Sequence, residues 1–266
     1  MPVEECGNML VMEAAVAVAT KDASFAASHL ELLETWVKYL LKNGRDPENQ
    51  LCTDDFAGHM AHNCNLSLKA IMGVAGLGII YGMLGRKRDA NTYKRIARDM
   101  ALDWEKRAAN ADGSYRLAFD AEGTFSMKYN IVWDKLFGTE IMPRRVLASE
   151  VASYMNKMDR YGMPLDSREH YTKSDWLVWT ATLCEHREDF ERMVEPMWHA
   201  FNATTDRVPM TDFYWTVTAE HKWYESKTYV TGSENDPVIK SFRNRTVQGG
   251  LFIKLLEYRG IMKIKK

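Results

Sequence analysis

Residues 49–71, which read NQLCTDDFAGHMAHNCNLSLKAI, are the stretch around which the chain is organised. They lead into a helix that we expect to run to about Leu84, and Thr53 or Asp54 can cap its start. Acidic side chains lie favourably there, because the positive end of the helix dipole stabilises negative charge. The remaining ionisable and amide residues exceed these needs and are spaced at three or four, which predicts one face and one wall of a binding site: Asp55, His59, His62 and Asn63.

Helical segments joined by alternating short and long links extend in both directions from this stretch. Helices joined by short links are antiparallel neighbours, so all the long loops should emerge at one end. The sequence predicts five inner helices, within 2–19, 53–84, 129–137, 174–183 and 246–258, and four outer helices, within 24–42, 89–109, 144–158 and 188–202.

An inner and an outer layer of helices predict an all-α fold, an α/α toroid of the six-hairpin type. Its chemistry is expected at the end where the long loops converge. A closed ring of this type has six inner and six outer helices, so we expect an incomplete ring, open at the N-terminal side. No linker divides the chain, and a single domain of residues 1–266 is predicted.

Composition narrows the classes of function. The chain is 46% hydrophobic and can bury a full core, while its net charge of −1 and dispersed basic residues argue against nucleic-acid binding. No apolar run reaches the ~20 residues of a membrane span, and residues 9–19 are too short for a signal peptide and follow acidic residues. The four cysteines lack metal-finger spacing and leave the disulfide state open. A small neutral or zwitterionic substrate fits this charge better than a polyanion.

Long stretches spread over nearly the whole chain resemble the glutaminase A family, the extracellular fungal and bacterial glutaminases. The matching segments are 2–9, 49–71, 129–136, 161–168, 171–176, 205–212 and 248–256. The resemblance implies an α/α toroid that hydrolyses the side-chain amide of L-glutamine to glutamate and ammonia, located outside the cell or in the periplasm. Family members are several hundred residues longer, with an upstream β-rich region and the opening helices of the toroid. Residues 216–244 fit the family pattern less well.

Amide hydrolysis needs activated water or a nucleophile, an acid for the departing amine and donors for the oxyanion. The sequence has no GxSxG elbow and no SxxK, so paired carboxylates acting through water are the favoured hypothesis. Helix capping and solvation explain the same acids equally well. Glu4 and Glu5 are adjacent on a helix, where side chains diverge by ~100°, so at most one points into the site. The catalytic candidates are Asp54, Asp55, Glu5 and Asp175.

A second group could hold the substrate. An arginine fork binds carboxylates in a bidentate manner, which favours Arg168 for the α-carboxylate, although an internal brace between Asp166 and Arg168 is at least as good an explanation. Tryptophans could line the pocket or simply fill the core. The substrate-binding candidates are Glu4, His59, Asn63, Trp133, Asp134, Asp166, Arg168, Lys173, Trp176, Trp179, Asp212 and Trp215.

Three alternatives stay open. His59 and His62 could suggest zinc, but there is no HExxH and no third ligand, so hydrogen-bonded support is favoured and no metal or cofactor is predicted. Acids and indoles also suit a glycoside hydrolase with two carboxylates. The third alternative is a catalytically inactive toroid fragment. An incomplete ring would expose an apolar flank, which predicts self-association or association with the missing N-terminal region.

Overall fold

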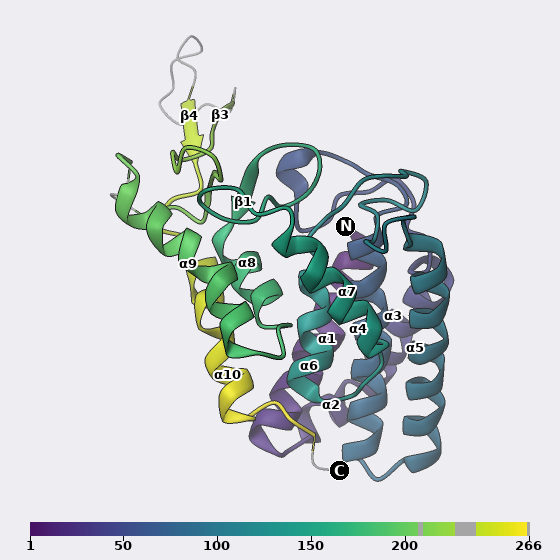
Figure 1. The fold of residues 1–266 in the computed structure, drawn as a ribbon. Helices are drawn as coiled ribbons and strands as arrows, with labels where there is room; N and C mark the ends of the chain where they lie inside the picture. The colour runs from purple at the N-terminus through teal and green to yellow at the C-terminus, as the bar shows by residue number, and fades with distance from the viewer. Residues whose placement is uncertain (207–209, 227–237, 265–266) are drawn as a thin grey trace.

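The computed structural model describes residues 1–206, 210–226 and 238–264 and is mainly helical (Figure 1). The inner helices are α1 (Pro2–Thr20), α4 (Cys64–Met83), η2 (Tyr129–Ile131) continuing into α6 (Val132–Phe137), α8 (Ser174–Ala181), and η3 (Thr246–Phe252) continuing into α10 (Ile253–Arg259). The outer helices are α2 (Ser24–Ser28), α3 (Leu30–Asn43), α5 (Lys87–Ala108), α7 (Arg144–Met155) and α9 (Arg187–Ala203). The predicted all-α toroid is confirmed.

Helix α4 is the centre of the core. Every residue from Cys64 to Tyr81 is buried, because α1, α3, α5 and η2 all pack against this helix. Its glycines allow the backbone of α1 to approach: a Cβ on Gly76 would lie 2.8 Å from the carbonyl oxygen of Leu10. The close helix contact expected from the glycine-rich sequence is therefore present.

The same helix corrects one sequence-based exclusion. By length and composition α4 could cross a membrane, although we expected no apolar run of that size. Within the protein, 89% of its most apolar window is buried. A helix that is apolar on all sides is also what a core position surrounded by other helices requires.

The start of α4 is later than predicted. Asn63 is its N-cap, and its side-chain oxygen accepts a hydrogen bond of 2.9 Å from the backbone N–H of Leu66. Residues 53–59 form a loop with one short 3₁₀ turn, η1 (Asp55–Ala57), and Thr53 and Asp54 do not cap α4. Positive φ angles at Gly58 (87°) and His62 (59°) interrupt any helix before Cys64. The expected single helical face over residues 55–63 is therefore absent.

Two further differences concern short elements. The outer helix expected over residues 24–42 is divided at His29, whose φ of −118° is not helical. Strand β1 (Tyr171–Lys173) pairs antiparallel with β2 (Phe213–Trp215), and β3 (Trp223–Ser226) pairs with β4 (Val238–Ser241). Three of these strands lie in the expected 203–244 loop, of which residues 207–209 and 227–237 lie outside the described part of the chain.

The long loops meet at one end of the ring, drawn at the top of Figure 1. Isolated bridges join them directly, including Asn63 with Ala118, and Ser126 with Asp166. The sequence-predicted arrangement of long and short connections therefore holds, and it brings the N-terminal ends of the inner helices to a common place.

Candidate active site

The first inner helix contributes a buried carboxylate. The Glu4 side chain accepts hydrogen bonds from the Thr53 hydroxyl and from Asn8 Nδ2 (3.2 Å), and Lys69 Nζ lies 3.4 Å from Glu4 Oε1. Glu4 is only 2% exposed, whereas Glu5 is exposed. Of this adjacent pair it is therefore Glu4 that points inward, and the prediction that Glu5 lies in the site does not agree with the structure.

Asp54 lies beside this group and is held by two neighbours. Cys52 Sγ donates to Asp54 Oδ1 (2.6 Å), and Arg168 Nη2 donates to Asp54 Oδ2 (2.7 Å). Burial, together with the negative charge of Asp54, raises the pKa of the Cys52 thiol, which keeps this cysteine protonated as a donor. Asp54 is thus a buried acceptor whose orientation is fixed from two sides.

Arg168 also forms the predicted brace with Asp166. Its Nε and Nη2 atoms donate to the two carboxylate oxygens of Asp166 at 2.8 and 2.6 Å. Burial alone would lower the pKa of the guanidinium, but hydrogen bonds to and charges on Asp166 and Asp54 raise it, so the group is a permanent cation. Within the described residues Arg168 Nη1 donates no hydrogen bond, and this atom is available to a further anion.

A third group comes from β1 and the start of α8. Lys173 Nζ contacts Asp212 and lies 3.8 Å from Asp175 Oδ1, and Arg245 Nε donates to Asp212 Oδ1 (3.1 Å). Burial lowers the pKa of Lys173 to about 7, with Asp175 opposing and Arg245 reinforcing the shift. Burial raises the pKa of Asp175, which Lys173 partly offsets. Two ionisable groups with oppositely shifted pKa values are typical of acid–base sites.

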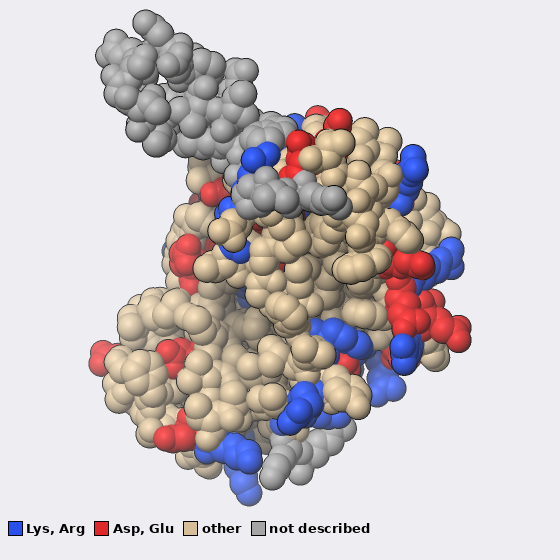
Figure 2. Space-filling model, turned by 90° about the vertical axis from the view of Figure 1, so that its left-hand side faces the viewer, with Lys and Arg blue, Asp and Glu red and all other residues tan. Residues whose placement is uncertain are grey.

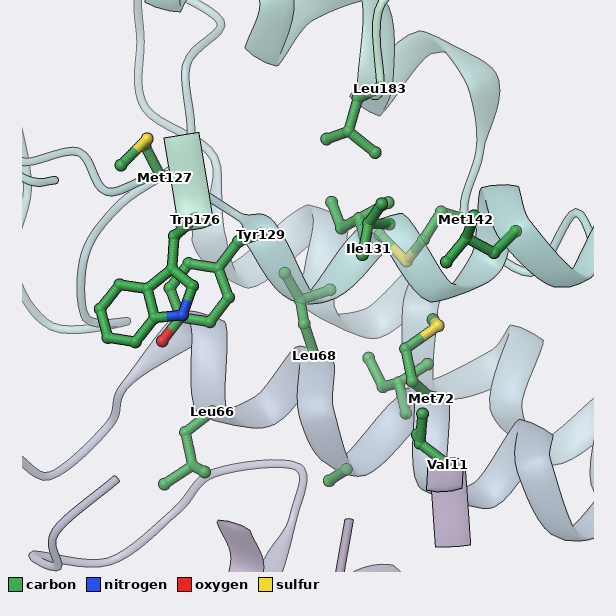
Figure 3. Close-up of a cluster of buried hydrophobic side chains, with 14 of the residues drawn as sticks. Val11, Leu66, Leu68, Met72, Met127, Tyr129, Ile131, Met142, Trp176 and Leu183 are labelled. Atoms are coloured by element: carbon green, nitrogen blue, oxygen red, sulfur yellow. The ribbon is translucent and has the colours of Figure 1, made fainter. Parts of the chain in front are cut away.

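Tyr129 connects the three groups. Burial raises its pKa, and the charges of Asp54, Glu4 and Asp175 raise it further, so its hydroxyl lies within electrostatic reach of carboxylates on three different segments. Its ring stacks on Trp176 with centroids 4.5 Å apart, and Figure 3 shows the two rings overlapping above Leu66. The charges of the three acids therefore act on an aromatic surface formed by Tyr129 and Trp176.

Several buried polar atoms of β1, α8 and η3 have no hydrogen-bond partner among the described residues. They are Thr172 Oγ1, Ser174 Oγ, Asp175 Oδ1, Trp179 Nε1, Thr180 Oγ1 and both side-chain polar atoms of Gln248. Buried polar groups are nearly always paired, and a concentration of unpaired ones indicates a place that receives water or ligand. Gly250 allows η3 to come this close, because a Cβ there would lie 2.9 Å from both Asp175 Cβ and Trp179 Nε1.

Other predicted residues lie elsewhere. Asp55 and His59 are exposed, although the charge of Asp55 still reaches Lys173. Asn63 caps α4 and donates to Cys52 Sγ at 3.5 Å, so it supports the site from behind. Asp134 on α6 accepts hydrogen bonds from Thr139 and from the backbone N–H groups of residues 141 and 142, so its carboxylate is bound to the short 138–143 link at the opposite end. We therefore remove Asp134 from the proposed site.

The two remaining tryptophans have packing contacts. Trp133 meets the edge of Trp179 with centroids 5.6 Å apart. Trp215 packs on Tyr171 (6.0 Å), and Lys222 Nζ lies 4.3 Å from the centroid of its ring. Both are half-buried, so their predicted contact with substrate stays a prediction.

The histidines do not form a pair. His62 Nδ1 bonds Asp46 Oδ1 (2.7 Å) on the outer side, which raises the pKa of His62. Across residues 1–206, 210–226 and 238–264, no group of three or more His, Cys, Asp or Glu side chains is arranged to hold a metal ion.

Four residues of the site were missed from the sequence: Cys52, Lys69, Tyr129 and Arg245. Lys69 could have been predicted from the sequence, because a single lysine inside the apolar run of α4 must find a charged partner when it is buried. No sequence pattern indicated the contact between Arg245 and Asp212, since the two residues are 33 positions apart and meet only through the fold.

Comparison with known proteins places this sequence in a family. The family model described as "Glutaminase A six helical-hairpin domain" matches residues 1–255. The chain belongs to this family. Glutaminase A of Aspergillus oryzae is 33% identical over 260 residues, which make up 96% of this chain and 35% of that protein. A protein of Arthroderma benhamiae named "Probable glutaminase" is 31% identical over 211 residues, covering 69% of this chain and 24% of that protein.

The resemblance to the glutaminase A family is thus confirmed. This chain spans about a third of the length of the Aspergillus protein. The site described above lies inside the matched region, because all of its residues fall within positions 1–255.

Proposed function

We propose that this glutaminase A family chain is a hydrolase that cleaves the side-chain amide of L-glutamine to glutamate and ammonia. The observation that carries the proposal is the meeting of Asp54, Glu4 and Asp175 around Tyr129, beside a buried lysine of shifted pKa. The relatives named glutaminase support the substrate class. A site outside the cytoplasm remains a prediction from the family resemblance.

Asp54 is the proposed base. A carboxylate accepts a proton from water while the water oxygen attacks the amide carbon. Arg168 and Cys52 hold the two Asp54 oxygens in one orientation, yet each oxygen keeps a lone pair for the water. Cys52 itself is not the proposed nucleophile, because its raised pKa keeps it as a thiol.

Asp175 and Lys173 form the proposed acid side. When the C–N bond breaks, the amide nitrogen must gain a proton to leave as ammonia. A carboxyl of raised pKa holds its proton more readily than an ordinary carboxyl and can deliver it, and the neighbouring ammonium of Lys173 can restore it. In each turnover the base gains one proton from water and the acid gives one proton to the leaving nitrogen. Water therefore supplies the hydroxyl group of glutamate and the hydrogen added to ammonia.

The α-carboxylate and the α-ammonium of glutamine require protein side chains of opposite charge. Arg168 Nη1 is the proposed donor to the α-carboxylate, since the other guanidinium contacts are already made within the protein. Asp212 and Glu4 are the buried carboxylates proposed to face the α-ammonium. Trp176, stacked on Tyr129, supplies the apolar surface for the two methylene groups of the glutamine side chain.

The test measures ammonia and glutamate released from L-glutamine by the purified chain, with aryl glycosides assayed in parallel. The proposal expects amide hydrolysis that is lost in Asp54→Asn. Release of the aryl alcohol instead would establish a glycoside hydrolase, in which two carboxylates flank a glycosidic bond. Activity on neither substrate class in a preparation that unfolds cooperatively would establish the inactive toroid.

A further inference from the structure

The Trp179 indole carries a buried donor that has no acceptor in the described part of the chain. Its Nε1 atom is shielded from solvent and makes no hydrogen bond to any of these residues. By contrast, the buried indole of Trp104 on α5 donates to the backbone oxygen of Cys64 at 2.8 Å. Leaving a buried donor unpaired costs free energy, so the Trp179 N–H indicates a place that an acceptor from outside the chain occupies.

This N–H lies beside the proposed acid. Asp175 and Trp179 are one turn apart on α8, so their side chains share a face of the helix. A Cβ on Gly250 would lie 2.9 Å from both Trp179 Nε1 and Asp175 Cβ, so the indole N–H and the carboxyl group meet under the same point of η3. Asp175 Oδ1 is also buried without a hydrogen-bond partner among the described residues. The two side chains are therefore placed to meet one ligand group.

The other unpaired side chains of β1, α8 and η3 can change roles, whereas the indole cannot. They are the hydroxyl groups of Thr172, Ser174 and Thr180 and the amide of Gln248, each of which can accept as well as donate. The indole N–H only donates, and its rigid ring meets Trp133 edge-on with centroids 5.6 Å apart. Helix α8 packs against α9 and α10, and Figure 2 shows that the α9–α10 side is hollowed and largely uncharged around the hollow. A hydrogen bond to developing negative charge is stronger in such surroundings than in water.

The proposed hydrolysis needs a donor that the base and the acid do not supply. When water adds to the amide carbon, Asp54 takes a proton from the water and the π electron pair of the C=O bond moves to the oxygen, which becomes an oxyanion. When the C–N bond breaks, its electron pair leaves with the nitrogen, to which Asp175 gives a proton, and an oxygen lone pair re-forms the C=O bond. A donor aimed at the oxygen lowers the barrier to the first step, because it stabilises the charge that develops there.

We propose that Trp179 Nε1 donates a hydrogen bond to the carbonyl oxygen of the substrate amide and to the oxyanion that this oxygen becomes. The inference rests on the proposed amide hydrolysis and supplies its oxyanion donor. The carbonyl oxygen then faces Trp179, and the amide nitrogen lies on the side of Asp175. Because the oxygen carries more negative charge in the transition state than in the bound amide, the hydrogen bond strengthens during the reaction and contributes to kcat more than to KM.

The first test replaces each of two indoles by a phenyl ring. Trp179→Phe removes the unpaired N–H, and Trp104→Phe removes one that is bonded inside the protein. Initial rates of ammonia release from L-glutamine should show kcat lowered by about 10²-fold or more in Trp179→Phe, with KM changed by less than about threefold. Trp104→Phe should keep kcat, and its urea unfolding midpoint should fall further than that of Trp179→Phe, because a hydrogen bond within the core is lost. A purely structural role of Trp179 would lower the midpoint and leave kcat unchanged.

The second test observes the N–H without catalysis. The probe is L-methionine sulfone, a glutamine analogue in which a tetrahedral sulfur with two oxygens replaces the amide carbon and which cannot be hydrolysed. The full chain is prepared with tryptophan whose indole nitrogen is isotopically labelled, and the indole NMR signal that is absent from Trp179→Phe belongs to Trp179. Saturating probe should move the proton resonance of Trp179 Nε1 downfield, as formation of a hydrogen bond to oxygen does, and leave that of Trp104 in place.

The two tests separate this inference from the proposed function. In a chain that hydrolyses L-glutamine, a kcat kept in Trp179→Phe or an unmoved Trp179 signal would overturn the inference alone. A shifted Trp179 signal in a chain that releases no ammonia would support the oxygen-binding N–H and contradict the proposed hydrolysis. Absence of both the ammonia and the shift would overturn both.

Discussion

Arg168 donates a hydrogen bond to Asp54 across 114 positions of sequence, with its Nη2 atom 2.7 Å from Asp54 Oδ2. The same guanidinium also donates a hydrogen bond to Asp166, which lies in the same loop as Arg168. One arginine therefore joins the loop before α4 to the loop before β1, and it fixes the carboxylate that we propose as the base. The brace between Asp166 and Arg168 that the sequence suggested is present, whereas the binding of the substrate α-carboxylate by Arg168 stays a prediction.

Replacing Arg168 by Gln should remove this link. Asp54 and Asp166 would remain buried with unmet acceptors, which costs about 1–3 kcal/mol of stability. The loss of orientation should lower kcat by about 10²-fold, because small displacements of a catalytic group are that costly. Urea unfolding and initial rates of ammonia release check the two effects. Unchanged kcat would contradict the proposed positioning of Asp54.

Asp54 and Asp55 are adjacent carboxylates with different surroundings, so Asp55 serves as the control for Asp54. Asp54 is 8% exposed and hydrogen-bonded, whereas Asp55 is exposed on η1. Asp54→Asn should lower kcat by about 10²-fold or more, as expected when a general base is removed. Asp55→Asn should keep most of the activity. A circular-dichroism melting curve close to that of the unmodified chain is expected for Asp55→Asn, whereas Asp54→Asn should destabilise the protein by about 1–3 kcal/mol because Arg168 loses one carboxylate partner. An inactive Asp55→Asn with an active Asp54→Asn would reverse the assignment.

Much of the architecture could be predicted from local pattern. Helical periodicity and the alternation of short and long links are properties of neighbouring residues, and they sufficed for the inner and outer layers. The start of α4 was misplaced because Asp54 and Asn63 are both good N-cap residues. Only the positive φ angles at Gly58 and His62 decide between them.

The site residues were harder to predict from the sequence than the helices were, and the reason is physical. Which of Glu4 and Glu5 points inward depends on how α1 is rotated against α4, and that rotation is set by packing at Gly73 and Gly76. Asp134 was assigned to the site because it follows an inner-helix start, yet its oxygens are used by the 139–142 link. Side-chain direction follows from tertiary contacts, and spacing alone does not contain it.

Lys173 should make both the stability of the protein and its proposed activity depend on pH near neutrality. Its pKa in the folded protein is about 7, below the ordinary lysine pKa of 10.5, so between these values the unfolded chain binds one proton more than the folded protein. Stability should therefore rise with pH from about 7 to 10.5, and Lys173→Met should flatten that slope. Because the ammonium is the proposed proton source, activity should fall as pH rises above about 7. Unfolding curves and pH–rate profiles of both proteins check this, and an unchanged profile in the variant would exclude the role.

Gly250 and Gly249 allow the close packing of η3 on α8 to be tested directly. A Cβ at Gly250 would lie 2.9 Å from Asp175 Cβ and from Trp179 Nε1, whereas a Cβ at Gly249 would meet nothing within 4 Å. Gly250→Ala should therefore push η3 away from Asp175, destabilising the protein by about 1–3 kcal/mol.

The displacement should also lower kcat, since it moves the wall that faces the proposed acid. Gly249→Ala places the same methyl group on the same short element and should change the free energy of unfolding by less than about 0.5 kcal/mol. The comparison requires chemical unfolding and kinetics of both variants side by side. Equal behaviour of the two would show that the approach of η3 to Asp175 does not limit either folding or catalysis.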